Sequence, residues 1–95
     1  MKEENISIRK QTTPLSRRII QLQEQGFTYD FEHAGRFLIC VQTGVELDIS
    51  AIKIVSLDCF MPPGAERRYL YALESESGFR GIMLTSSRSL DPVYP

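Results

Sequence analysis

The spacing of the apolar residues changes once along this sequence, at Gly26. Over residues 15–22, leucine and isoleucine recur three and four positions apart, which is the period of one helix face. Thr13-Pro14 stands before this run, and threonine as an N-cap followed by proline in the first turn is typical of a helix start. Glycine enters the left-handed conformation beyond a helix end without strain. We therefore predict a helix over 14–25.

Beyond Gly26 the apolar residues alternate with polar ones or form short continuous runs, which predicts strands. Met61–Ala65 contains two adjacent prolines and cannot lie inside a sheet. Residues 45–50 fit either a loop or a short turn of helix. The predicted strands are 27–32, 36–42, 52–60, 68–75 and 79–86. The expected fold class is α+β, with one N-terminal helix packed on an antiparallel meander sheet of about five strands.

The length of 95 residues is enough for one domain. We expect this domain to span 13–86. Residues 1–12 are mostly polar and are expected to form a flexible N-terminal arm, or at most a short edge strand. Residues 87–95 are expected to form an irregular C-terminal tail.

The first predicted hairpin is apolar on both faces. A two-residue turn at Ala34-Gly35 pairs Phe31 with Leu38, and Tyr29 with Cys40. The opposite face then carries Phe37, Ile39 and Val41.

The second predicted hairpin is also apolar on both faces. A turn at Glu76-Ser77 pairs Tyr71 with Ile82, and Ala72 with Gly81. Small residues leave room for a neighbouring backbone, so the Ala72–Gly81 pair predicts where the helix comes close to the sheet.

A sheet that is apolar on both faces needs cover on both. One helix of about 12 residues is roughly 18 Å long and covers one face only. Three kinds of cover are open for the second face: a curled sheet, the terminal segments or another subunit. We expect a homodimer in which Phe37, Ile39 and Val41 form the interface. The alternative is a sheet that coils around the helix, with the tails covering the rest.

Composition excludes several classes of function. The chain has 11 basic and 12 acidic residues, a net charge of −1, so it offers no broad attraction to a nucleic-acid backbone. Cys40 and Cys59 lie in apolar runs and are expected to be reduced core thiols. No apolar stretch follows the first five residues, and none approaches the roughly 20 residues that span a membrane. We expect a cytoplasmic protein that binds neither nucleic acid nor membranes.

The sequence carries no recognisable catalytic motif, and we expect no metal site and no cofactor. His33 is the single histidine and is expected at the surface, because a metal site needs several converging ligands. Asp30 and Asp58 lie on different predicted strands. They are candidates for paired carboxylate chemistry, but carboxylates paired with arginine are the favoured interpretation.

A ligand-binding site is predicted beside the Pro62-Pro63-Gly64 loop. Arg67 and Arg68 could grip an anion, although adjacent residues of a strand point to opposite faces. Tyr69 and Tyr71 follow on the same strand and could form an aromatic platform. A phosphorylated metabolite is the ligand class that fits these residues.

Two segments carry a resemblance to a known family. Gln25–Phe31 resembles an opening of the form G-[FY]-T-x-D-F. Arg68–Ser75 and Gly78–Leu84 resemble a hairpin of the form Y-A-[IL]-x-S…[KR]-G-[VI]-x-[VL]. Together they are similar, over residues 13–86, to uncharacterised bacterial proteins of comparable length that are often labelled phosphoribosylpyrophosphate synthetase. The resemblance implies a bacterial origin and a shared fold, and it assigns no site residues.

We therefore expect a non-enzymatic interaction or regulatory module that acts as a homodimer. The alternative is a binding domain for a small phosphorylated metabolite. A phosphoribosylpyrophosphate-related enzyme is a remote third possibility.

Overall fold

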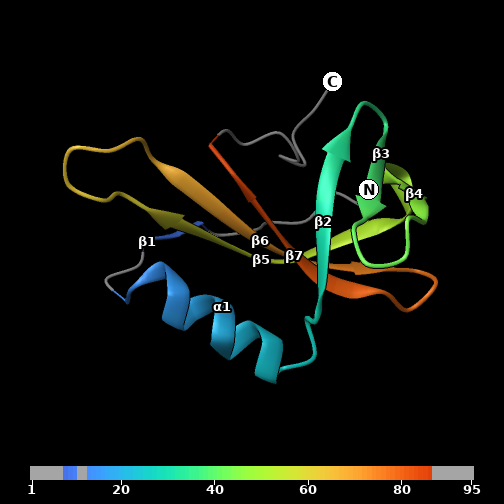
Figure 1. The fold of residues 1–95 in the computed structure, drawn as a ribbon, viewed down its shortest axis with the longest axis horizontal. Helices are drawn as coiled ribbons and strands as arrows, with labels where there is room; N and C mark the ends of the chain where they lie inside the picture. Colours follow the sequence, from blue (N-terminus) through green and yellow to red (C-terminus); the bar gives the residue numbers. More distant parts are fainter. Residues whose placement is uncertain (1–7, 11–12, 87–95) are drawn as a thin grey trace.

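The computed structural model describes residues 8–10 and 13–86 (Figure 1). Within them the chain forms one α-helix, one short 3-10 turn and seven strands. In chain order these are β1 (Ile8–Lys10), α1 (Leu15–Glu24), β2 (Tyr29–Ala34), β3 (Phe37–Cys40), β4 (Glu46–Asp48), η1 (Ile49–Ala51), β5 (Ile52–Phe60), β6 (Arg68–Ser75) and β7 (Arg80–Thr85). Apart from β1, the predicted arm over 1–12 and tail over 87–95 lie outside the described residues.

The strands form one mixed sheet in the order β1-β5-β6-β7-β2-β3-β4. The α+β class is confirmed, but the five-stranded antiparallel meander is wrong in detail. Two pairings are parallel, β1 with β5 and β2 with β7, and the strand β1 precedes the helix. Both parallel pairings join segments far apart in the sequence, which the apolar pattern of each strand does not specify. The ambiguous segment 45–50 forms most of β4 and η1.

The helix α1 ends in the way the sequence predicts. Gly26 has a φ of 101°, its N–H bonds to the Gln23 carbonyl, and the Phe27 N–H bonds to the Leu22 carbonyl. These two bonds form a Schellman motif, which is completed here by Leu22 and Phe27, both buried in the same cluster. At the other end Pro14 occupies the N-cap position and no side chain caps the helix. The expected Thr13 cap is therefore wrong.

One core cluster lies between α1 and the β5–β7 part of the sheet. Leu22 and Phe27 pack there with Leu70 and Ile82, and Leu15 and Ile19 lie at its margin. Figure 1 shows α1 running beneath these strands.

Two arginines tie α1 to the strands it covers. The Arg18 Nε donates to Asp58 Oδ2 at 2.8 Å, and the Asp58 side chain is fully buried. The Arg80 Nη1 donates to the Gln25 carbonyl at 3.1 Å, and its guanidinium lies 4.2 Å from the centre of the Phe27 ring. The Arg18 side chain is only 12 % exposed, because it pairs with this buried carboxylate.

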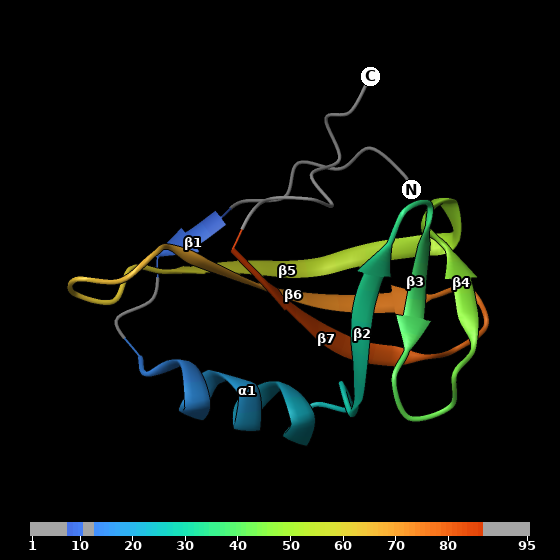
Figure 2. The same ribbon diagram turned by 45° about the horizontal axis from the view of Figure 1, so that its top comes forward.

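A second, larger core cluster covers the sheet face opposite α1. Tyr71, Leu73 and Met83 from β6 and β7 pack there against Phe31 and Leu38 from β2 and β3. Figure 2 shows β2, β3 and β4 standing at a steep angle across the end of β5–β7. The sheet thus curls away from the helix, and its own strands supply the second layer. Of the three kinds of cover that the sequence left open, a curled sheet is the one that the structure shows, although it curls away from the helix and not around it. The expected homodimer stays a prediction.

The first hairpin turns one residue later than predicted. Ala34 pairs with Phe37 across a turn at Gly35-Arg36, and Phe31 pairs with Cys40 instead of Leu38. Gly35 has a φ of 61°, as the first central position of a type II′ turn requires. Moving the turn by one residue shifts the pairing by two, so the predicted division of side chains between the faces of β3 is retained.

The second hairpin has a different register from the prediction, with a larger consequence. Tyr71 pairs with Met83, and Ala72 with Ile82. The Ser75 N–H bonds to the Phe79 carbonyl, so the connection consists of the three residues 76–78. Gly78 ends it with a φ of 98°. A one-residue change in register moves every side chain of a strand to the other face.

Gly81 lies where β2 crosses closest to β7, not beneath the helix. A Cβ atom at this position would overlap the Tyr29 carbonyl oxygen and lie 2.7 Å from the Phe31 ring. Two registered pairs, Tyr29 with Gly81 and Asp30 with Ile82, make up this parallel seam. The absence of a side chain at Gly81 therefore allows the sheet to curl.

Candidate protein-binding face

The helix covers only part of its side of the sheet. Ile82 faces α1, and its partner Asp30 in β2 lies on the same side, so this sheet side continues onto β2, β3 and β4. We call its continuation the outer face; it is formed by Asp30, Glu32, Ala34, Phe37, Ile39, Val41, Glu46 and Asp48. The opposite sides of β2 and β3 are buried in the second core cluster.

An apolar stripe runs along β3 in the middle of the outer face. Phe37 is 40 % exposed, Ile39 is half-buried and Val41 is 52 % exposed. These are the three residues that the sequence predicted as an interface. The structure places Phe37 and Ile39 on the same side of β3, and Val41 directly follows the strand, where its N–H bonds to the Asp30 carbonyl of β2.

Carboxylates flank this stripe on both sides. Ile39 pairs with Glu32 of β2 and with Glu46 of β4, so it lies between two glutamates. Asp48 lies beside Phe37, and the Val41 N–H donates to the Asp30 carbonyl at 2.8 Å. The outer face is therefore apolar in the centre and acidic at both edges.

Two of the flanking carboxylates are held in place by local hydrogen bonds. The Asp48 Oδ1 accepts from the backbone N–H and the hydroxyl of Ser50, each at 2.8 Å, and these bonds lower the pKa of Asp48 below 3.8. The Asp30 Oδ2 accepts from Gln42 Nε2 at 2.8 Å. Within the described residues, neither Glu32 nor Glu46 forms an ion pair. These two carboxylates are thus available to a cation from outside.

The four predicted ligand-binding residues do not form one site. Arg67 and Tyr69 lie together, with the Arg67 Nη1 at 3.5 Å from the Tyr69 hydroxyl, a bond that raises the pKa of Arg67. Tyr71 is fully buried in the second core cluster. Arg68 lies on the other side of β6, where it pairs with Phe60. A ligand at the surface could therefore contact Arg67 or Arg68, but could not reach Tyr71 without opening the core.

A cleft of about 380 Å³ lies between the start of α1 and the β5–β6 loop. It contains the predicted Arg68, and the rest of its lining is mostly apolar. The lining residues are Thr13, Pro14, Leu15, Phe60, Met61, Pro62, Pro63 and Arg68.

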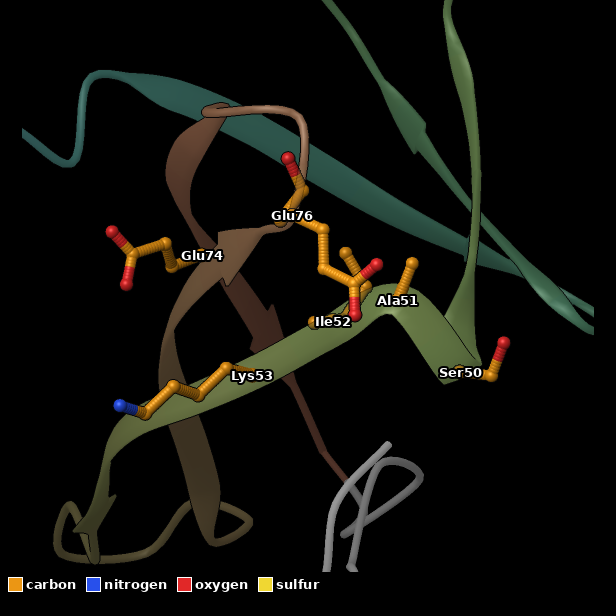
Figure 3. Close-up of a pocket in the computed structure, with 7 residues that line it drawn as sticks. Ser50, Ala51, Ile52, Lys53, Glu74 and Glu76 are labelled. Atoms are coloured by element: carbon orange, nitrogen blue, oxygen red, sulfur yellow. The ribbon is translucent and has the colours of Figure 1, made fainter.

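A smaller cleft of about 170 Å³ lies where β5 begins and β6 ends (Figure 3). Figure 3 shows Lys53 and Glu74 extending the same way from neighbouring strands, while the Glu76 carboxylate lies over Ile52. The Glu76 N–H donates to the Ala51 carbonyl at 3.0 Å, which closes this end of the sheet. The polar side chains that line this cleft do not all point the same way, so we assign the cleft no role.

The other candidate residues lie apart from one another. Asp58 is buried against Arg18, as the favoured interpretation predicted, whereas Asp30 is exposed on the outer face. His33 is exposed, and Cys40 and Cys59 are buried free thiols, as predicted. Among residues 8–10 and 13–86, no group of three histidine, cysteine or acidic side chains is placed to hold a metal ion.

Comparisons of the chain with protein-family models, with curated proteins and with solved structures gave no match. The resemblance to the bacterial family therefore stays a prediction. In the described part of the chain, no helix has the length and apolar character needed to cross a membrane.

Sequence reasoning identified the stripe and missed its acidic edges. The signal was present, because Asp30 and Glu32 alternate with aromatic residues, and Glu46 and Asp48 alternate across Leu47. The sequence of segment 45–50 fits a loop or a turn of helix as well as a strand, so it does not place Glu46 and Asp48 beside the stripe.

Proposed function

We propose that this protein is an interaction module that binds another protein chain through the outer face. The observation that carries this proposal is the apolar stripe of Phe37, Ile39 and Val41, which stays partly exposed although most of the large apolar side chains of β5–β7 are buried. Exposed apolar side chains bordered by polar residues are typical of protein interfaces. A homodimer is one form of this function, with a second copy as the partner.

Site-specific photocrosslinking tests the proposal in living cells. A benzoylphenylalanine placed at Phe37 or Val41 is expected to give discrete protein adducts. Ile20 is the matched control, because it is apolar and 54 % exposed on the outward side of α1, away from the outer face. An adduct of twice the chain mass identifies the homodimer, and any other mass identifies a different partner. If positions 37 and 41 give no adduct beyond that of position 20, the proposal is wrong.

A second candidate function is a ligand-binding domain, supported by the cleft that contains Arg68. A phosphorylated metabolite with an apolar group would place its anion near Arg68 and its apolar part against Phe60 and Met61. Ligand present at 100 times its Kd stabilises a fold by about 2.7 kcal/mol, which a thermal shift detects readily. We expect such a shift with a nucleotide or phosphosugar, and its loss in Arg68→Ala. The Arg9→Ala variant is the control on another strand. An unchanged melting temperature with all ligands would exclude this function.

A further inference from the structure

The charge of the outer face restricts its partner. Glu32 and Glu46 lie on the strands at either side of Ile39, and Asp30 and Asp48 extend the two acidic edges. Arg36, in the β2–β3 turn, is a cation whose charge acts on Asp48. A partner with an acidic or neutral rim would take water from these carboxylates without supplying a positive charge, which disfavours its binding.

The spacing of the outer face matches a helix. Neighbouring strands lie about 4.8 Å apart, so the glutamates on β2 and β4 are separated by roughly 10 Å at the backbone, about one helix diameter. Along β3, alternate side chains repeat about every 6.8 Å, close to the roughly 6 Å rise between helix residues four positions apart. A helix lying along β3 could therefore set apolar residues on the stripe and basic residues over both acidic edges.

The architecture also favours a helix over an extended segment. An added strand needs free backbone groups at a sheet edge, whereas the outer face presents side chains. The helix α1 already covers the neighbouring part of the same sheet side, so a bound helix would continue an existing helix layer.

A second copy fits the outer face less well. Two outer faces pressed together would oppose the same set of carboxylates. The helix α1 of another copy offers no apolar stripe, because Leu15, Ile19 and Leu22 already pack against its own sheet. Ile20 is the single large apolar residue exposed on α1.

We propose that the outer face binds an amphipathic helix of another protein, in which an apolar stripe is bordered on both sides by lysine or arginine. This inference rests on the proposed function and adds the chemistry and secondary structure of the partner. Burial of the apolar stripe would supply affinity, and the four carboxylates would select basic partners and set their orientation.

Fluorescence anisotropy with two synthetic helical peptides tests this inference on the full chain. Both peptides have 18 residues and the same leucine stripe, bordered by lysine in one and by glutamate in the other. We expect the lysine peptide to bind at least tenfold more tightly than the glutamate peptide, with an affinity that falls as salt is raised.

Charge reversal on the protein supplies the matched control. Glu32→Lys combined with Glu46→Lys is expected to weaken the lysine peptide at least tenfold and to strengthen the glutamate peptide. Glu24→Lys combined with Glu66→Lys makes the same change in net charge at exposed positions elsewhere, and both affinities should stay within twofold. All four positions are exposed, and circular dichroism verifies that each variant is folded.

The outcomes separate this inference from the proposed function. Equal binding of the two peptides, or no effect of the Glu32 and Glu46 reversal, would show that charge does not select the partner and would overturn the inference. If neither peptide binds while position 37 still crosslinks to a protein, the inference fails and the proposed function stands. If crosslinking at positions 37 and 41 also fails, both are wrong.

Discussion

Replacing Gly81 by alanine tests how the sheet curls. The added Cβ would overlap the Tyr29 carbonyl oxygen and lie 2.8 Å from the Tyr29 carbonyl carbon. Ordinary van der Waals contact begins near 3.4 Å, so β2 and β7 must separate or twist apart. A separation of roughly 1 Å would stretch backbone bonds of about 2.9 Å beyond hydrogen-bonding distance.

The expected cost follows from these contacts. Overpacking costs about 1–3 kcal/mol, and each weakened backbone hydrogen bond about 1 kcal/mol more. The seam has two registered pairs. Alanine also restricts the unfolded chain, which returns about 0.4–1 kcal/mol. We expect Gly81→Ala to lower the free energy of unfolding by about 2–4 kcal/mol, a large share of the roughly 5–15 kcal/mol typical of a domain.

Urea denaturation followed by far-ultraviolet circular dichroism measures this change. Gly44→Ala is a useful comparison, because a Cβ there meets nothing within 4 Å and only the φ of 74° is strained. Its cost should stay near 1–2 kcal/mol. Hydrogen exchange should show faster exchange for β2 in Gly81→Ala while β5 and β6 stay protected. A Gly81→Ala variant as stable as the wild type would refute the close approach of β2 to β7.

Three further predictions concern the polar contacts. Arg18→Met leaves the buried Asp58 without its guanidinium and should lower the free energy of unfolding by about 3 kcal/mol in urea denaturation; an unchanged value would contradict the buried ion pair. Arg80→Ala removes the bond to the C-terminal end of α1 and the cation over its neighbouring ring, and should cost about 1–3 kcal/mol by thermal denaturation, with Arg9→Ala as the control. A carbon-13 NMR titration should give Asp48 a pKa below 3.8, so that its stabilising effect is present above this pH and lost as the pH falls through the lower value. Ser50→Ala should raise that pKa toward 3.8, and a pKa already at 3.8 in the wild type would contradict the capping bonds.

Local features of this fold could be predicted from the sequence. The helix over 15–24 follows from the spacing of its apolar residues, and its end follows from Gly26. β5 and β6 have the bounds that their apolar runs predict. These features depend on neighbours within a few positions, and the sequence displays those neighbours directly.

The partners of the strands could not be predicted in the same way. β2 pairs with β7 and β1 with β5, although about 50 positions separate the paired residues in each case. The apolar pattern of a strand predicts that the strand is buried, but not which strand lies beside it. The register of β6 with β7 differs from the prediction because a three-residue connection ending at Gly78 places the side chains of β7 differently from a two-residue turn.

The same contrast between local features and distant pairings applies to the candidate site. The sides of β3 follow from strict alternation, so Phe37, Ile39 and Val41 could be grouped from the sequence. Their relation to Glu46 depends on β4, a strand of three residues that is too short to leave a clear pattern. The sequence does not distinguish the fully buried Tyr71 from a surface tyrosine. The strands that cover it, β2 and β3, are distant from it in the sequence.

The two edges of the sheet also bear on whether copies of this protein can associate edge to edge. Both edge strands, β1 and β4, have three residues, whereas β5, next to β1, has nine. A long apolar strand with an open edge is a template for aggregation, and short charged edge strands suppress it. Ile8, Arg9 and Lys10 therefore protect the longest strand of the sheet. Loss of these three residues, by proteolysis or truncation, would leave the long apolar edge of β5 open to pairing with another copy.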